Sequence, residues 1–197
     1  MSIENNPLVK QSPHKYGAVS FDEIKQEHFI PALEYAIKDA EKILDEVKNN
    51  TDAPTFENTA LPMETCSELM GTIAHTYFNL MSAESDNDFK ELAQQISPKL
   101  SAFSNNVHLD SKLFEKVKYL YENMDAENLN AEQKRLVSES YKGFTLNGAL
   151  LNDTDKEKVR KIDEELSKLS PKFSQNTLNA TNEYTYYTED ESDLLGI

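Results

Sequence analysis

Histidines are the first side chains to consider for chemistry, because imidazole nitrogens serve as zinc ligands and as general bases near neutral pH. A zinc site on a helix needs ligands three or four residues apart, as in His-Glu-x-x-His, so that both side chains reach one ion. The four histidines are His14, His28, His75 and His108, and none has a ligand-type residue at those offsets. We therefore predict no metal-binding and no catalytic residue in this chain. Only His75, which lies near Tyr77 within an expected helix, has a claim to a binding role.

Other reactive patterns fail for equally simple reasons. Gly143 and Gly148 have the spacing of a phosphate-binding loop, but Ala149 and Leu150 occupy the places of its Lys and Ser or Thr. No serine lies in a Gly-x-Ser-x-Gly turn. Runs of adjacent acids, such as residues 163–165 and 189–191, resemble paired catalytic carboxyls but are typical of solvated faces. No cofactor site is predicted.

The composition excludes some partners. The 197 residues include 35 Asp and Glu against 20 Lys and Arg, a net charge of -15 that repels nucleic acid and anionic lipid. We interpret this acidity as a solvated surface, with an acidic groove for basic ligands as the alternative. The sequence has neither an apolar run long enough to span a membrane nor the start of a signal peptide, and its single cysteine is Cys66. A cytoplasmic protein is expected.

Apolar residues recur every three or four positions over most of the chain, which predicts amphipathic helices. The first helix should begin near Glu27 to Ile30 and end near Asn49 and Asn50. The others should begin after Pro62, after a cap within residues 85–88, after Asp110 and at Asn130, and the last should have Asp153 or Thr154 as its cap. Pro98 and Pro171 fall inside the third and sixth patterns, so a kink or a break is expected at Pro98 and a kink at Pro171.

These helices predict an all-α fold, an antiparallel bundle of about six helices with kinked long helices and a short β-prone C-terminal tail. Residues 1–20 are interpreted as an extended arm, residues 21–182 as the helical domain, and residues 183–197 as the β-prone segment. In the arm, Leu8, Val9, Tyr16 and Val19 suggest that it packs on the domain. In the tail, Tyr184 to Thr188 favour a strand, although no partner strand is in sight.

Short strings along the whole chain resemble the N-terminal portion of thimet-oligopeptidase-like zinc metallopeptidases. One is Phe-Asn-Leu-Met-Ser-Ala-Glu at residues 78–84. The others lie at residues 6–8, 21–32, 53–59, 98–101, 109–114, 141–144, 147–148 and 169–179. None is a catalytic signature, so the resemblance depends on their number and order. Within the family, the chain most resembles the bacterial dipeptidyl carboxypeptidase and oligopeptidase A branch.

The resemblance implies a noncatalytic helical domain that forms part of the substrate channel wall of a two-lobed peptidase. In such an enzyme the zinc and its His-Glu-x-x-His helix lie in the C-terminal part, where the glutamate activates a zinc-bound water against short peptides. The implied partners are the catalytic part of the same polypeptide and short peptide substrates. The face toward that catalytic part should be more apolar than a normal surface. We therefore expect the isolated chain to be able to self-associate. The alternative is a stand-alone helical module that binds a protein or peptide.

Overall fold

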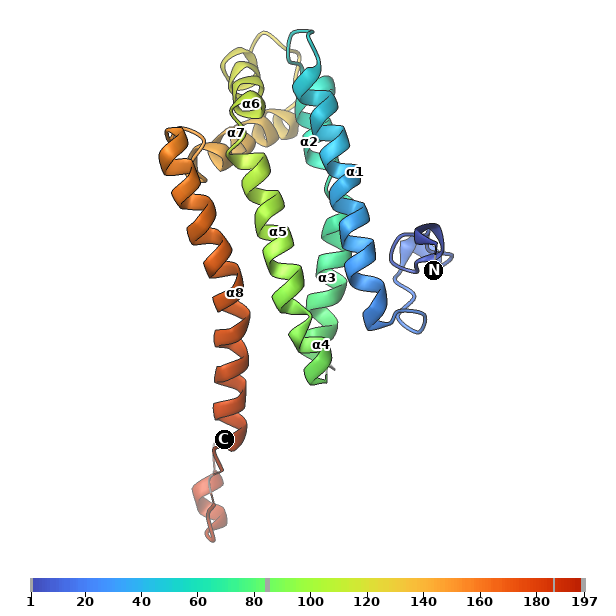
Figure 1. Ribbon diagram of the computed structural model, residues 1–197, viewed down its shortest axis with the longest axis vertical. Helices are drawn as coiled ribbons and strands as arrows, with labels where there is room; N and C mark the ends of the chain where they lie inside the picture. The colour runs from blue at the N-terminus through green and yellow to red at the C-terminus, as the bar shows by residue number, and fades with distance from the viewer. Residues whose placement is uncertain (1, 84–85, 186, 196–197) are drawn as a thin grey trace.

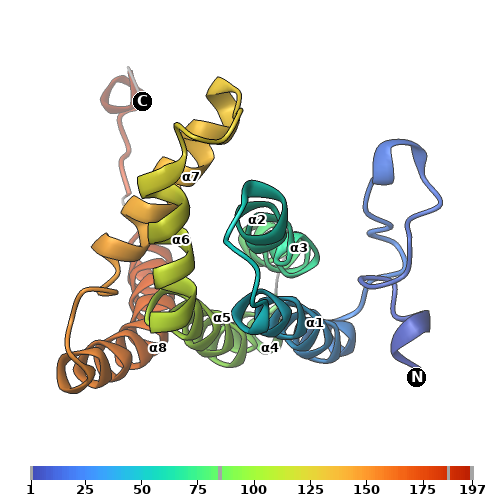
Figure 2. The same cartoon turned by 90° about the horizontal axis from the view of Figure 1, so that it is seen from above.

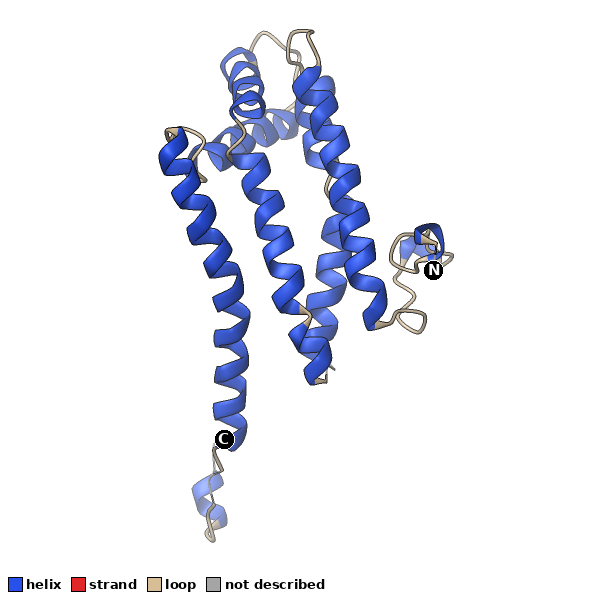
Figure 3. Cartoon of the chain, in the orientation of Figure 1, coloured by secondary structure: helices blue, strands red, loops and turns tan. Residues whose placement is uncertain are grey.

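The structure, a computed structural model, describes residues 2–83, 86–185 and 187–195. Over these residues the regular structure is helical and no strand forms (Figure 3). The predicted all-α class is therefore confirmed.

The helices follow the predicted order closely. They are α1 Phe29–Asn49, α2 Leu61–Thr65, α3 Glu68–Ala83, α4 Asn87–Glu91, α5 Ala93–His108, α6 Ser111–Asn123, α7 Ala131–Leu146 and α8 Asp153–Glu183. Because the short α2 and α4 lead directly into α3 and α5, the described chain has six long helical segments, as the sequence predicts.

Side-chain caps explain where several helices begin. The Asp110 carboxylate accepts hydrogen bonds from the backbone N–H groups of Lys112 and Leu113, at 2.8 and 3.0 Å, and so starts α6 as predicted. Asn130 and Gln133 form a reciprocal capping box at the start of α7. For α8 the prediction that Asp153 or Thr154 is the cap is wrong by one or two positions. The side chain of Asn152 accepts from the Asp155 N–H at 3.0 Å, and both predicted residues already lie within the first turn.

Neither internal proline ends its helix. Pro98 lies within α5, and Pro171 lies within the 31 residues of α8. A proline removes one backbone hydrogen bond, so packing and the remaining hydrogen bonds must keep the helix continuous. The helix does not break at Pro98, while several helices are bent, in agreement with the expected kinked helices (Figure 1).

The long helices α8, α5 and α1 run side by side, with the short α4 at the start of α5. The remaining four helices lie on one side of this row as two separate groups (Figures 1 and 2). One group is α2 with α3, which packs on α1; the other is α6 with α7. The main core lies where α1, α3, α5 and α6 meet, and its fully buried side chains include Phe29, Leu33, Ile73, Tyr77, Ile96 and Leu113. A smaller core of Phe56, Ala60, Leu120 and Val137 joins α6 and α7 to the turn before α2.

An aromatic cluster forms the end of the main core near the start of α1. The Phe29 ring meets those of Tyr77 and Phe89 edge-on, with centroids 5.4 and 5.6 Å away. The Tyr77 hydroxyl donates to the Phe89 carbonyl at 2.7 Å. Burial raises the pKa of Tyr77 from its ordinary value of 10 to about 12, because the phenolate would lose its hydration.

The Tyr77 pKa predicts a loss of stability at high pH. The folded state holds the phenolic proton more tightly than the unfolded state. The contribution of protonated Tyr77 to the free energy of unfolding is therefore complete below pH 10 and is lost as pH rises toward 12. The free energy of unfolding should fall by up to about 1.4 kcal/mol per pH unit in this window. Urea titrations of the natural chain and of Tyr77→Phe test this, since the difference between them should shrink from pH 10 upward; a constant difference would contradict it.

The N-terminal arm packs only in part. The Asn6 amide donates to the His28 carbonyl at 2.9 Å, and Leu8 is buried in the main core. Val19 is half-buried, but the prediction that Tyr16 packs is wrong because that side chain is 91% exposed. Tyr16 adopts a left-handed backbone (φ 63°) beside Gly17 (φ 69°), in a turn that carries its ring away from the domain.

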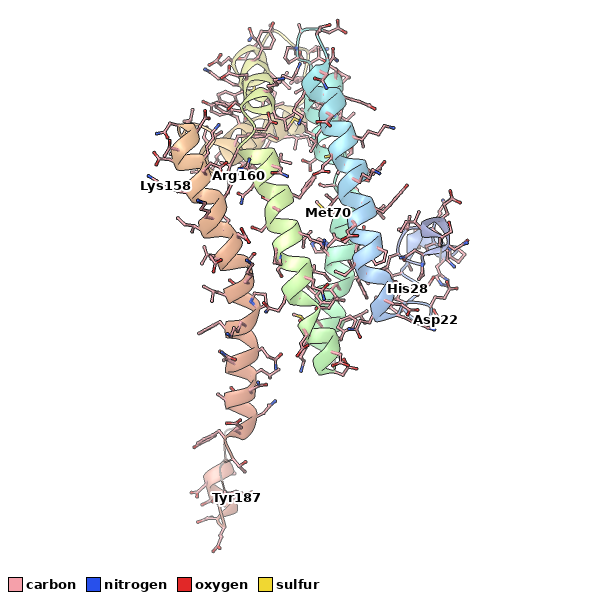
Figure 4. The ribbon with its side chains drawn as sticks, in the orientation of Figure 1. Asp22, His28, Met70, Lys158, Arg160 and Tyr187 are labelled. Atoms are coloured by element: carbon pink, nitrogen blue, oxygen red, sulfur yellow. The ribbon has the colours of Figure 1, made fainter. Side chains whose placement is uncertain are left out.

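The C-terminal tail begins with an extended stretch that pairs with no described strand, and it then forms a short 3-10 helix at Glu191–Leu194. After α8, Tyr184 has strand-like dihedral angles (φ −81°, ψ 122°), and the described tail residues form no strand. Tyr184 and Tyr187 are exposed, and Tyr187 lies beyond the end of α8 (Figure 4). The local β-propensity therefore gives extended backbone without a ladder, because a strand needs a neighbour. The predicted residues Tyr186, Gly196 and Ile197 lie outside the described part of the chain.

Candidate functional site

The histidines are scattered over the structure. His14 lies in the arm, and His75, the one histidine considered for a binding role, is exposed on α3. His108 ends α5, where its Nδ1 is 3.0 Å from the Ser104 carbonyl oxygen and its ring lies 5.3 Å from that of Phe144. In the part of the chain that the structure describes, no cluster of three or more His, Cys, Asp or Glu side chains could hold a metal ion.

His28 is buried and lies between the N-terminal arm and the start of α1 (Figure 4). Its Nδ1 accepts a hydrogen bond from the Lys25 N–H at 3.0 Å, which places the proton of the neutral ring on Nε2. That Nε2 is buried without a hydrogen-bond partner, and the nearest carboxylate oxygen, from Glu27, is 4.0 Å away. The contacts of His28 therefore fix the start of α1 and do not assemble a ligand set.

Cys66 and His108 line one apolar cavity of about 680 Å³ between the α2–α3 group and the α6–α7 group. The Cys66 thiol donates to the Met63 carbonyl at 3.2 Å, and burial raises the pKa of this thiol to about 11. A nucleophilic cysteine needs a lowered pKa, since the thiolate is the reactive form. The thiol that lines this cavity is therefore half-buried and unreactive.

The glycine pair that resembles a phosphate loop forms a helix end. Asn147 caps α7, Gly148 adopts φ 97°, and the Ala149 N–H donates to the Phe144 carbonyl at 3.0 Å. A side chain at position 148 would have its Cβ only 3.0 Å from a Leu151 methyl carbon and 3.2 Å from one of Leu109. Both the left-handed backbone and close packing therefore require glycine here.

The acidic runs lie at the surface wherever the structure describes their side chains. Glu164 on α8 pairs with Lys168 at 2.7 Å, and the hydrogen bond from Lys168 lowers the pKa of this carboxyl. Asp190 accepts from the Ser192 N–H at 2.9 Å, and hydrogen bonding to Ser192 lowers its pKa as well. A general acid requires a raised carboxyl pKa, so these groups are shifted in the wrong direction for that role.

An open groove of about 1320 Å³ lies between α5 and the second half of α8, closed at one side by α3 and α4. Its apolar lining includes Phe78, Ala93 and Leu178. Its polar lining consists mostly of uncharged amides and hydroxyls, among them Gln94, Gln95, Ser97, Ser170, Ser174 and Gln175. Such side chains can donate to and accept from a peptide backbone. The sequence does not predict this groove, because polar residues on two separate helices give no signal that they face each other.

Among the described residues, no helix is both long enough and apolar enough to cross a bilayer.

Comparison with known proteins finds relatives along nearly the whole chain. A family model described as the N-terminal domain of neurolysin/thimet oligopeptidase matches residues 32–156, which is more than half of the chain. Dipeptidyl carboxypeptidase of Salmonella typhimurium is 29% identical over 195 residues, 99% of this chain and 29% of that protein. Its Escherichia coli counterpart is 28% identical over 192 residues, 98% of this chain and 28% of that protein. Oligopeptidase A of Salmonella typhimurium is 27% identical over 192 residues, which cover 98% of this chain and 28% of that protein. The chain thus spans less than a third of the length of these relatives.

Proposed function

The chain belongs to the neurolysin/thimet oligopeptidase family through its N-terminal domain, and we propose that it is the noncatalytic helical domain of a zinc-dependent oligopeptidase of the peptidyl-dipeptidase type. The match over residues 32–156 is the observation on which this proposal depends. Residues 21–182 form the domain proper in this proposal, residues 1–20 its arm, and residues 183–197 the segment that leads to the catalytic part. The parent enzyme hydrolyses short peptides in the cytoplasm.

Zinc would have to be bound elsewhere in the parent enzyme. The described residues provide no group of ligands for it, and the histidines lie far apart along the chain at positions 14, 28, 75 and 108. The role of this domain is therefore to bind, orient and restrict. We assign no catalytic, cofactor-binding or metal-binding residue to it.

The groove between α5 and α8 supports a role in the wall of the substrate channel. Its uncharged amides and hydroxyls suit the backbone of peptides of varied sequence, since they select neither acidic nor basic side chains. A wall of packed helices also limits entry to short, flexible chains. The alternative function, a stand-alone module that binds a peptide, would use the same groove without any catalytic part.

The natural reading frame and a peptidase assay distinguish the two functions. We expect the frame to continue past Ile197 into a His-Glu-x-x-His motif, and the protein expressed from the whole frame to hydrolyse short peptides in a chelator-sensitive manner. The 197-residue chain alone should neither bind stoichiometric zinc nor cleave peptides, because it lacks a ligand set. Chelator-sensitive cleavage by the short chain, or a frame that stops at Ile197, would refute the proposal.

A further inference from the structure

We propose that the outer stripe of α8, formed by Ile162, Leu166, Leu169 and Phe173, is the surface on which the polypeptide following this domain docks. The inference rests on the proposed function, because it takes its occupant to be the C-terminal remainder of the parent chain. In the parent enzyme this face of α8 joins the helical domain to the C-terminal remainder.

The four residues of the outer stripe occupy one face of α8. Their spacing of four, three and four positions brings successive side chains above one another on a helix. All four are exposed: Ile162 by 57%, Leu166 by 52%, Leu169 by 55% and Phe173 by 74%. Isolated apolar side chains are common on protein surfaces, but a continuous apolar stripe is typical of an interaction site.

The face of α8 that contacts the rest of the domain is a different one. Lys156 is buried there, Arg160 donates to the Asn106 side-chain oxygen at 2.9 Å, and the Ser101 hydroxyl donates to the Asp163 carbonyl at 3.4 Å. Figure 4 shows Arg160 on the side of α8 that faces α5. Positions 156, 160 and 163 of α8 have the same spacing as positions 162, 166 and 169 of the outer stripe, and each lies six positions earlier. Six positions correspond to a rotation of about 120° around a helix. The outer stripe therefore points away from α5.

This arrangement is the reverse of an ordinary surface helix. A helix at the edge of a bundle normally buries its apolar face and exposes its polar face. Here α8 contacts α5 through polar groups and presents apolar ones outward. Such a helix is stabilised fully only when a second surface covers the outer stripe.

Two observations favour the C-terminal remainder over a second copy as the occupant. The relatives are more than three times as long as the region that matches, since 99% of this chain covers 29% of the first relative. The outer stripe also lies on the last long helix, which would lead directly into that additional polypeptide. A second copy is disfavoured because each chain has a net charge of -15, and two such chains repel each other.

Thiol labelling of single-cysteine variants tests the interface. Cys66→Ala, combined in the longer protein with alanine at any cysteine beyond residue 197, provides a background without thiols. Into this background Phe173→Cys places a thiol on the outer stripe, and Glu164→Cys places one on the opposite, exposed face of α8. Each variant is made in the 197-residue chain and in the protein expressed from the whole natural frame, and both react with DTNB under native conditions. We expect Phe173→Cys to react at least about tenfold more slowly in the longer protein. Glu164→Cys should react at similar rates in both.

Each other outcome has a definite meaning. Equally fast labelling of Phe173→Cys in a longer protein that still hydrolyses peptides overturns the interface and leaves the proposed function intact. Protection already present in the 197-residue chain that increases with its concentration identifies a second copy as the occupant, and it too overturns the inference. Protection in a longer protein that lacks peptidase activity supports the interface and refutes the function. A frame that stops at Ile197 removes the occupant and refutes both.

Discussion

Phe29→Ala is expected to lower the free energy of unfolding by about 3–5 kcal/mol, the usual cost of removing a large aromatic side chain from a core. Phe29 is completely buried at the start of α1. It contacts Tyr77 of α3 and Phe89 of α4 edge-on, so alanine would leave a cavity between three elements. Urea titration followed by far-ultraviolet circular dichroism measures the loss.

Tyr35→Ala is a matched control for this substitution. Tyr35 is an aromatic residue of the same helix, but its side chain is 41% exposed. Its removal should cost under about 1 kcal/mol, because water already reaches the ring and no closed cavity forms. Equal losses for the two variants would show that Phe29 is not at the centre of the core.

Local sequence rules predicted most of the helices. Asp110 and Asn130 cap α6 and α7 because short polar side chains satisfy backbone N–H groups at helix starts. Leu33 and Ile73 are buried because they lie on the apolar stripes of α1 and α3. These signals depend on neighbours within a few residues, so the sequence displays them directly.

Features that depend on distant contacts could not be predicted in this way. Ile162, Leu166 and Phe173 recur with a helical period, which suggests a core-facing stripe, yet all three are exposed. Periodicity shows which residues share a face but not what covers it. The β-prone tail around Tyr184 is a similar case, because propensity does not supply a second strand.

For the candidate site, the sequence allowed only a negative prediction. The sequence has no helical ligand pair around His75 or the other histidines. The absence of site residues from this chain stays a prediction. The groove between α5 and α8 was out of reach, because Gln94 and Ser170 come together only through packing of two helices far apart in sequence. Its polar lining has no motif, so only the fold shows that these groups face one space.

Lys156 is the clearest case of a residue whose role the sequence conceals. A lysine near the start of a charged helix suggests a solvated side chain, but Lys156 is only 6% exposed. Its ammonium group donates to the Leu109 carbonyl at 3.1 Å and to the Ser111 hydroxyl at 2.9 Å. Leu109 caps α5 and Ser111 begins α6, so one side chain joins the start of α8 to the junction between those helices.

Lys156→Met is therefore expected to lower the free energy of unfolding by about 1–3 kcal/mol, because it keeps the length of the side chain but leaves buried polar partners unsatisfied. Lys158→Met removes the same charge two residues away, where the side chain is 67% exposed and pairs with Asp155 at the surface. That change should stay within about 0.5 kcal/mol. Urea titration gives both values, and amide hydrogen exchange should show faster opening of the first turns of α8 in Lys156→Met alone. Similar effects of the two substitutions would mean that charge on α8, and not the buried contacts of Lys156, holds this helix against the domain.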